Sequence, residues 1–392
     1  MKILHTVEFY PPSTGGMQEV VRQLSERLVK MGHQVTVATT KLPERKSNLM
    51  NGVNIVEFNI SGNAVRKIVG DTEQYQKVLI GSDFDIVTNF AAQQWATDLA
   101  LPILDKIKAK KVFVPTGFSG LKDPMYKDYF EQMKSRMKKY DMNVFLSNDY
   151  RDVNFAKENG IDKRVLITNG AGEDEFIGKQ STSFRKQMDI PDDAFLILHV
   201  GSYTGIKGHE EALEIFIQAN LPNSFLLMVG NDNDKFAKLK RGKLGFRGLV
   251  NYFKKHSPKI LITSLNREQT VQAYQTADLF LFPSNIECSP IVLFECMASK
   301  TPFLTTDVGN AAEIIEWSHA GMLLPTRIDK EGYSHAEILP SAEMLRTVFA
   351  NSANREEMKT NGFKSWKMNF SWEIIAEKYS ALYKSLLLPS NS

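Results

Sequence analysis

Two glutamates, Glu287 and Glu295, stand eight positions apart in the segment 283–295, which reads PSNIECSPIVLFE. Ser289 is a favoured N-cap residue and Pro290 a favoured first helical residue, so the pattern predicts a helix that begins between the two carboxylates. A rise of about 1.5 Å per residue puts Glu295 about 8 Å along that helix, similar to the span from diphosphate to ribose diol in a nucleotide. Each carboxylate could hold a pair of hydroxyls; the alternative is a helix-capping acid and a surface glutamate. Because Glu295 lies in an apolar stretch, it needs a partner.

Two glycine-containing loops each follow a predicted strand and precede a predicted helix. Residues 11–16 end in Gly15 and Gly16, and residues 201–208 include Lys207. Glycine lets a backbone approach a ligand closely, and free N–H groups at a helix N-terminus favour an anion such as phosphate. A lysine there would add a positive point charge. The alternatives are a plain strand-to-helix turn and a solvated lysine, and the GxxxxGK[ST] spacing of a P-loop is absent.

Short apolar, β-branched runs alternate with longer helical patterns, which is typical of parallel βαβ units with helices on both sheet faces. The runs are strongly apolar, as burial on two sides requires. In the first half of the chain the predicted strands are 2–8, 34–39, 85–89, 111–115, 143–147 and 164–168. In the second half they are 195–200, 225–229, 260–263, 279–282 and 303–305.

The segment 178–193 is polar, carries little hydrophobic periodicity and is predicted to link two domains, with the boundary near residue 182. We therefore expect an α/β protein with two Rossmann-like, doubly wound parallel-sheet domains, 1–182 and 183–370, that face a cleft. A last amphipathic helix is predicted at 371–388. Its apolar stripe must pack on one of the domains, and we expect it to complete the first.

Composition narrows the class of protein. The chain has 392 residues, of which 43% are hydrophobic, and its 48 Lys plus Arg nearly balance 45 Asp plus Glu. This composition excludes disorder, and the net charge of +3 is too small for a dedicated nucleic-acid binder. Two cysteines, Cys288 and Cys296, offer no secreted-type disulfide framework. With no export signal and no apolar run of about 20 residues, we expect a cytoplasmic protein.

The densest basic cluster occupies residues 235–259, where lysines and arginines interleave with apolar residues. It would suit peripheral contact with an anionic membrane at the inner face, or a phosphate-bearing acceptor; the alternative is a helix with a charged solvent face. The Asp-x-Asp patterns at 83–85 and 232–234 are explained as residues that lead into a strand and form a turn. Because the seven histidines also lack ligand spacing, no metal site is expected.

The segments PPSTGG, KGHEEAL, FPSNIECSPIVLFECMAS and VGNAAEII, in this order, resemble family 4 retaining glycosyltransferases with the GT-B fold. The most specific part is the E-x7-E spacing of Glu287 and Glu295, supported by Asn169-Gly170 and Glu313. The resemblance implies a nucleotide-sugar donor held mainly by the second domain and a glycan or lipid-linked acceptor held by the first. It also implies transfer with retention at the anomeric carbon, as in cell-surface polysaccharide or glycoconjugate synthesis.

The same resemblance assigns roles to single residues. Glu295 would bind the ribose hydroxyls and Glu287 those of the donor sugar, while Gly15 and Gly16 would approach the diphosphate or the transferred sugar. Lys207 would hold the diphosphate, together with the amides around Ile291 and Val292, and Glu287 and Lys207 are the expected catalytic residues. The other expected donor-binding residues are Gly201, Ser202, Ser289 and Pro290. No cofactor or metal is expected, and Lys207 and the helix amides can meet part of the leaving group's negative charge. Because there is little evidence of a base, a front-side mechanism is expected, in which the leaving phosphate itself accepts the acceptor's proton.

Two departures from the family pattern affect the expected chemistry. Ser202 and Tyr203 occupy the stretch where the family usually has an arginine, which leaves less positive charge for the diphosphate. Thr116, on the acceptor or sugar side, stands where the family usually has a histidine, and a hydroxyl lacks the acid-base capacity of an imidazole. One alternative is therefore a degenerate GT-B protein that binds nucleotide or supports a partner enzyme. Another is a nucleotide-sugar epimerase, which would need acid-base residues in the cleft.

Overall fold

The protein is described by a computed structural model that covers residues 1–81, 83–178, 184–231 and 258–389. The chain divides into two compact units, Met1–Asn169 with Trp372–Ser392, and Gly170–Ser371. The predicted boundary near residue 182 lies outside the described residues. The chain returns to the first unit at Trp372, so the last helix belongs to the same unit as the first strand.

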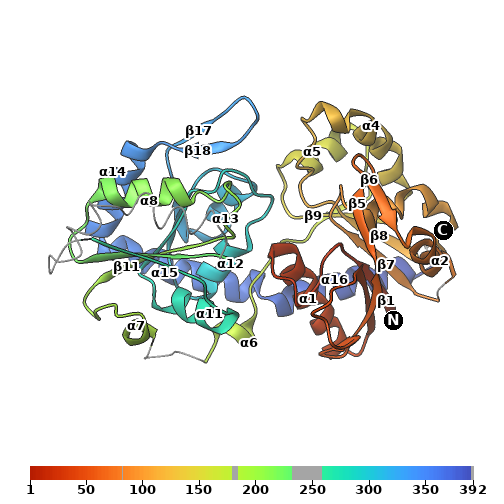
Figure 1. Cartoon of the computed structure of the whole chain (residues 1–392), viewed down its shortest axis with the longest axis horizontal. Helices are drawn as coiled ribbons and strands as arrows, with labels where there is room; N and C mark the ends of the chain where they lie inside the picture. Colours follow the sequence, from red (N-terminus) through yellow and green to blue (C-terminus); the bar gives the residue numbers. More distant parts are fainter. Residues whose placement is uncertain (82, 179–183, 232–257, 390–392) are drawn as a thin grey trace. The chain divides into compact units, whose positions relative to one another are not determined.

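The first unit is built on an eight-stranded sheet with the order β10-β9-β8-β7-β1-β2-β4-β3. Figure 1 labels four of these strands, β1, β7, β8 and β9. Its pairings are parallel except that of β3 with β4. The strands are β1 (Lys2–Thr6), β2 (Gln34–Thr40), β3 (Leu49–Met50), β4 (Val53–Phe58), β7 (Ile86–Phe90), β8 (Lys110–Val114), β9 (Met142–Phe145) and β10 (Arg164–Leu166). A separate hairpin joins β5 (Ile60–Asn63) and β6 (Lys67–Gly70).

Helices cover this sheet. They are α1 (Gly16–Lys30), α2 (Thr72–Gly81), α3 (Trp95–Asp98), α4 (Lys127–Arg136), α5 (Arg151–Glu158) and α16 (Trp372–Leu387), with short 3₁₀ turns at Leu101–Lys106, Pro124–Tyr126 and Met137–Lys139. Leu4 of β1 packs in a core with residues of α2 to α5, whereas its neighbour His5 contacts Ser25 of α1 and Tyr383 of α16. Because successive strand residues point to opposite faces, both faces are buried under helices.

The second unit contains a six-stranded, all-parallel sheet with the order β13-β12-β11-β14-β15-β16. The strands are β11 (Phe195–Val200), β12 (Ser224–Val229), β13 (Lys259–Thr263), β14 (Leu279–Phe282), β15 (Phe303–Thr305) and β16 (Gly321–Leu323), and β17 (Thr326–Ile328) pairs with β18 (Ser334–Ala336) as a hairpin. The helices are α6 (Glu173–Phe176), α7 (Phe184–Gln187), α8 (His209–Ala219), α11 (Arg267–Thr276), α12 (Ile291–Ala298), α13 (Ala311–Ser318), α14 (Ile338–Ala350) and α15 (Ser352–Ser365), followed by a π-helical turn, Trp366–Phe370.

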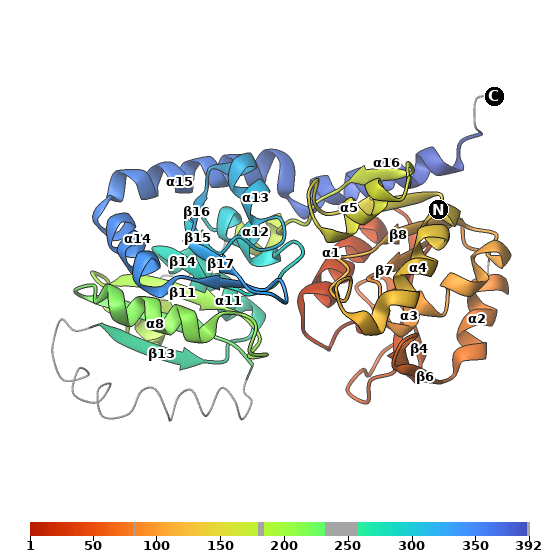
Figure 2. The same cartoon turned by 90° about the horizontal axis from the view of Figure 1, so that it is seen from above.

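Alternation along β11 again separates two cores. Leu196 and Leu198 pack with residues of α11 and α12, whereas Ile197 packs with residues of α8 and α14. Figure 2 labels β11 and these four helices. Each predicted strand is present in the structure, with ends that shift by at most a few residues. The strands β3, β4 and β16 and both hairpins were not predicted. β3 and β16 are edge strands and the hairpins lie outside the main sheets, all with two to four residues each, whereas the six-residue β4 lies between β2 and β3.

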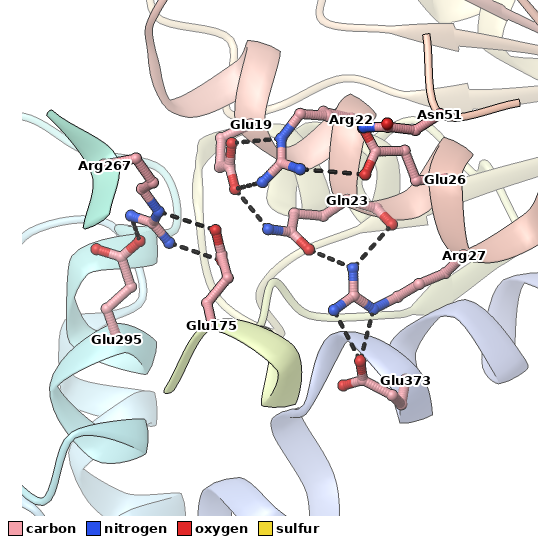
Figure 3. A network of polar contacts seen from close by, with 10 residues as sticks. All are labelled: Glu19, Arg22, Gln23, Glu26, Arg27, Asn51, Glu175, Arg267, Glu295 and Glu373. Carbon is pink, nitrogen blue, oxygen red and sulfur yellow. Dashed lines mark hydrogen bonds and ion pairs between the residues drawn. The ribbon is translucent and has the colours of Figure 1, made fainter. Parts of the chain in front are cut away.

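The last helix is joined to the first unit by polar contacts as well as by its apolar stripe. Arg27 of α1 has a side chain only 5% exposed, and its Nη2 lies 2.7 Å from Oε1 of Glu373 at the start of α16 (Figure 3). Near the other end of α16, the Tyr383 hydroxyl lies 2.8 Å from Thr88 Oγ1 and 3.3 Å from His5 Nε2. Burial lowers the pKa of His5 to about 3, so its ring is neutral at pH 7. These contacts connect α16 to α1, β1 and β7.

We expect Tyr383→Phe to lower the free energy of unfolding by about 1–3 kcal/mol, because it leaves two buried polar partners of one hydroxyl unsatisfied. Urea unfolding would measure this change. The matched control is Tyr10→Phe in the same unit, since the buried Tyr10 hydroxyl has no hydrogen-bond partner among the described residues. Its loss should be neutral or slightly stabilising. An equal loss of stability in both variants would contradict the prediction.

Candidate functional site

Lys207 and Glu287, which are 80 positions apart in the chain, lie against each other in the second unit. Lys207 follows β11 and Glu287 follows β14, and these two strands are neighbours in the sheet. Because parallel strands end at the same edge, their following loops meet there. Lys207 Nζ lies 2.7 Å from Glu287 Oε1, and Ser284 Oγ donates to the same oxygen at 2.9 Å. The structure therefore brings together the two residues predicted to act in catalysis.

Two glycines let the segment 283–288 pack closely on its neighbours. Gly208 has φ +69°, and a Cβ there would lie 1.9 Å from the carbonyl oxygen of Pro283. Gly309 has φ +55°, and a Cβ there would lie 2.2 Å from the carbonyl oxygen of Cys288. A backbone hydrogen bond also holds this segment: the main-chain N–H of Asn285 donates to the carbonyl oxygen of Ile206 at 3.0 Å. The backbone around Glu287 is thus held from both sides.

Two buried histidines bond backbone carbonyls near the site: His209 bonds one in the loop 201–208, and His199 bonds one in the neighbouring strand β14. His209 Nε2 lies 3.1 Å from the carbonyl oxygen of Gly201, and His199 Nδ1 lies 2.9 Å from that of Leu281. Since a carbonyl only accepts, each of these ring nitrogens must be the donor. Burial lowers the pKa of His209 to about 4 and that of His199 well below its usual value. Both rings are therefore neutral supports for the backbone rather than acid-base groups, and the sequence analysis did not identify them.

The helix α12 begins one residue later than expected. Its N-cap is Pro290, with extended backbone and no side-chain capping hydrogen bond, and its first residue is Ile291. The prediction that Ser289 caps this helix was therefore wrong. The proline has φ −68° and ψ 111°, so the chain turns into the helix only after it. The first amides of the helix are those of Ile291 and Val292, as the anion-binding hypothesis requires.

Glu295 is the buried member of the pair, with a side chain only 5% exposed on α12. Its Oε1 lies 2.5 Å from Nη1 of Arg267, the first residue of α11 (Figure 3). Arg267 also pairs with Glu175 of α6, through Nε at 3.1 Å and Nη2 at 2.9 Å. The sequence predicted that Glu295 needs a partner but did not identify Arg267. The run Asn266-Arg-Glu-Gln269 forms a capping box, which marks where α11 begins. No local sequence pattern indicates which carboxylate the arginine of this run pairs with.

Gly15, Gly16 and Thr116 belong to the first unit, whereas the other predicted site residues belong to the second. Gly15 is the N-cap of α1, and Gly16 is its first residue. The preceding loop is held by Arg45, whose buried guanidinium donates to the carbonyl oxygens of Tyr10 at 2.9 Å and Pro11 at 3.0 Å. The sequence analysis missed Arg45, which lies in a polar stretch with no distinctive pattern.

Thr116 follows β8 in a left-handed conformation, with φ +59°. The next amide, that of Gly117, donates to Oδ2 of the buried Asp152 at 2.8 Å. Burial raises the pKa of Asp152 to about 6, although hydrogen bonds from the Gly117 and Val153 amides act in the opposite direction. Non-glycine residues in this conformation are strained and cluster at functional sites. Asp152 is therefore a support for the loop that carries Thr116.

The remaining predictions have different outcomes. Ser202 is exposed in the loop after β11. The basic segment 235–259 and the pattern at 232–234 lie outside the described residues, except for positions 258 and 259. Asp83 and Asp85 contact Lys2, which agrees with a structural explanation for the Asp-x-Asp pattern at 83–85.

In the described parts of the chain, no three His, Cys, Asp or Glu side chains group to hold a metal ion. Nor does any described helix combine the length and apolar character needed to cross a bilayer.

Comparison with known proteins identifies the family. The model for glycosyltransferase family 4 matches residues 14–171, and that for glycosyl transferases group 1 matches residues 180–364. An uncharacterized glycosyltransferase of Methanocaldococcus jannaschii is 24% identical over 406 residues, with 98% of each chain covered. The lipopolysaccharide glucosyltransferase WaaG of Escherichia coli is 29% identical over 178 residues, which cover 43% of this chain and 44% of WaaG.

A solved structure of Anabaena HepE in complex with UDP-glucose matches with a TM-score of 0.73 at 14% identity, covering 98% of this chain and 100% of HepE. The two matched family models and the fold agree. The chain belongs to the family 4 glycosyltransferases and has the GT-B fold, which confirms both predictions from the sequence.

Asp152 should make stability depend on pH. Its pKa is higher in the folded state, at about 6, than the value of about 3.9 in an unfolded chain. The folded protein therefore gains stability from the protonated form below about pH 4 and loses it as the pH rises through 6. Relative to Asp152→Asn, the wild type should lose up to about 3 kcal/mol of unfolding free energy between pH 4 and pH 7.5.

Urea unfolding of both proteins across this pH range would measure the difference. Asp162→Asn is the matched control, because this carboxylate has a side chain 91% exposed and should keep the wild-type pH dependence. Parallel stability curves for the wild type and Asp152→Asn would show that Asp152 does not titrate in this range.

Proposed function

We propose that this glycosyltransferase moves a hexose unit from a nucleoside diphosphate sugar to a glycan or lipid-linked acceptor in polysaccharide or glycolipid synthesis. UDP-glucose is the first donor to test, because HepE was solved with it and the similar region of WaaG belongs to a lipopolysaccharide glucosyltransferase. We assign the donor mainly to the second unit and the acceptor to the first, which carries Thr116 on the acceptor or sugar side.

One observation carries this proposal: Lys207, Glu287 and the first turn of α12 lie at one edge of one sheet, with Glu295 further along the same helix. A cation and free helix amides suit a diphosphate, and carboxylates suit hydroxyls. This arrangement follows the order of charge along a nucleotide sugar. We propose that donor binding draws Lys207 from Glu287 to the diphosphate, which leaves the Glu287 carboxylate to accept hydrogen bonds from the sugar.

The transfer step is proposed to proceed with retention and without a metal ion. The bond from the anomeric carbon to the phosphate oxygen breaks, and a bond to the acceptor oxygen forms on the same face of the sugar. The acceptor's proton passes to the leaving phosphate, so no separate base is required. Lys207 and the amides of Ile291 and Val292 stabilise the negative charge that grows on the diphosphate.

Contact with an anionic membrane through residues 235–259 stays a prediction for the acceptor side of the reaction. A lipid-linked acceptor is presented at a membrane surface, and a cluster of basic residues would bring the enzyme to it.

A thermal-shift screen with UDP, GDP, ADP and their sugars would test the proposal, followed by transfer and donor-hydrolysis assays with and without EDTA. Ligand binding to the native state stabilises it by RT ln(1 + [L]/Kd), so one nucleotide series should raise Tm distinctly. We expect UDP-glucose to do so and turnover to be unaffected by EDTA. Binding without turnover would instead favour the degenerate nucleotide-binding protein, for which the departures at Ser202 and Thr116 argue.

Lys207→Ala should lower kcat by about 10²- to 10³-fold, because it removes a cation from the site of growing negative charge. Initial-rate measurements with the donor found in the screen would show this loss. Lys359→Ala is the matched control, since Lys359 forms a surface ion pair with Glu356 in the same unit. Turnover near the wild-type rate in Lys207→Ala would remove this lysine from the mechanism.

A further inference from the structure

Arg267 connects three helices through two carboxylates. It is the first residue of α11, and it meets Glu175 of α6 with Nε and Nη2 and Glu295 of α12 with Nη1 (Figure 3). The guanidinium also lies over the Phe176 ring, 5.5 Å from its centroid. A planar guanidinium held by a two-bond fork on one side and by a ring face has little freedom to turn away. The remaining nitrogen of the guanidinium, Nη1, is therefore directed at Glu295.

Glu295 is a buried carboxylate with the Arg267 guanidinium beside it. Its neighbours on α12, Phe294 and Cys296, are completely buried, and an isolated carboxylate in such surroundings takes up a proton. The charge of Glu295 also acts on two buried groups, the Tyr274 hydroxyl of α11 and the Cys296 thiol. Burial, and after it the charge of Glu295, raise the pKa of both groups, so both are neutral at pH 7. Arginine stays protonated and supplies a lasting positive charge beside this carboxylate.

The two glutamates of the E-x7-E pattern thus have cations of different kinds. Glu287 pairs with Lys207, a flexible lysine that can move to a phosphate. Glu295 pairs with an arginine that is held in place by a second carboxylate. Because Glu175, Arg267 and Glu295 sum to a formal charge of −1, this cluster suits a neutral diol that donates O–H groups and disfavours a second phosphate.

We propose that Arg267, oriented by Glu175, is a positioning residue that keeps Glu295 charged and aimed, and thereby sets the affinity for the ribose diol of the nucleotide. This inference rests on the proposed function. Arg267 acts through Glu295 and is assigned no contact with the substrate. Its loss should therefore weaken nucleotide binding and raise KM for the donor more than it lowers kcat.

The test is calorimetric titration of the full-length protein with UDP at pH 6, 7 and 8. Arg267→Met should weaken binding at least tenfold at pH 7 and further at pH 6, because the unpaired Glu295 carboxyl becomes protonated as the pH falls. Arg267→Lys should recover part of the affinity, and Glu175→Gln should cause a smaller loss than Arg267→Met. Wild-type affinity with wild-type pH dependence in Arg267→Met would overturn the proposal.

Arg185→Met is the matched control. Arg185 pairs with Asp278 at 3.0 Å and bonds the carbonyl oxygens of Pro191, Ala194 and Thr276, so it is a comparable arginine outside the proposed site. Its loss should lower Tm and leave the affinity for UDP and its pH dependence unchanged. If Arg185→Met weakened UDP binding as much as Arg267→Met, the effect would be general destabilisation, and the positioning role would fall.

A double-mutant cycle separates this inference from the proposed function, because it needs no ligand. Glu295→Gln removes the charge that Arg267→Met leaves unpaired, so the double variant should have a higher Tm at pH 8 than Arg267→Met alone. Absence of this rescue would overturn the proposal. Rescue in a protein whose wild type binds none of the nucleotides would retain the Arg267–Glu295 coupling, but would refute the proposed function and the nucleotide role assigned here.

Discussion

The cost of burying the charge of Glu295 is the constraint on which the second unit's site depends. A carboxylate with a side chain 5% exposed must be matched by a cation or become protonated. The match comes from Arg267, whose own direction is set by Glu175. The positions of α6, α11 and α12 are thereby linked through three charged groups. Lys207 and Glu287 form a second cation–carboxylate pair, whose carboxylate is 13% exposed.

Parallel strand order brings these groups to one place. In the second sheet β14 follows β11 although about 80 residues separate them in sequence, so the loops that carry Lys207 and Glu287 share one edge. Buried polar groups then hold the loops: His209 supports Gly201, and Arg45 in the first unit supports the turn before Gly15. Rigid supports of this kind reduce the ordering that a ligand must otherwise impose.

The resemblance to family 4 glycosyltransferases implies departures from the family pattern at Ser202 and Thr116. Thr116 stands where the family usually has a histidine, and its backbone is strained. The loop that carries Thr116 is held by a buried aspartate, Asp152. The backbone after β8 is thus held by the hydrogen bond between Gly117 and Asp152 and not by the side chain of Thr116. The proposed front-side mechanism needs no base from the protein, which is compatible with a hydroxyl here.

The sequence alone determined the α/β class, the strands of both sheets except β3, β4 and β16, and the two glutamates, because apolar runs, turn residues and motif spacing are local signals. The edge strands β3 and β16 and the hairpins escaped prediction because a run of two to four residues carries little periodicity, a reason that does not apply to the six-residue β4. The partners of the site residues were decided only by the tertiary structure. Arg267 meets Glu175 and Glu295 across separations of 92 and 28 residues, and such pairings arise from the packing of helices on a sheet, which no local pattern encodes.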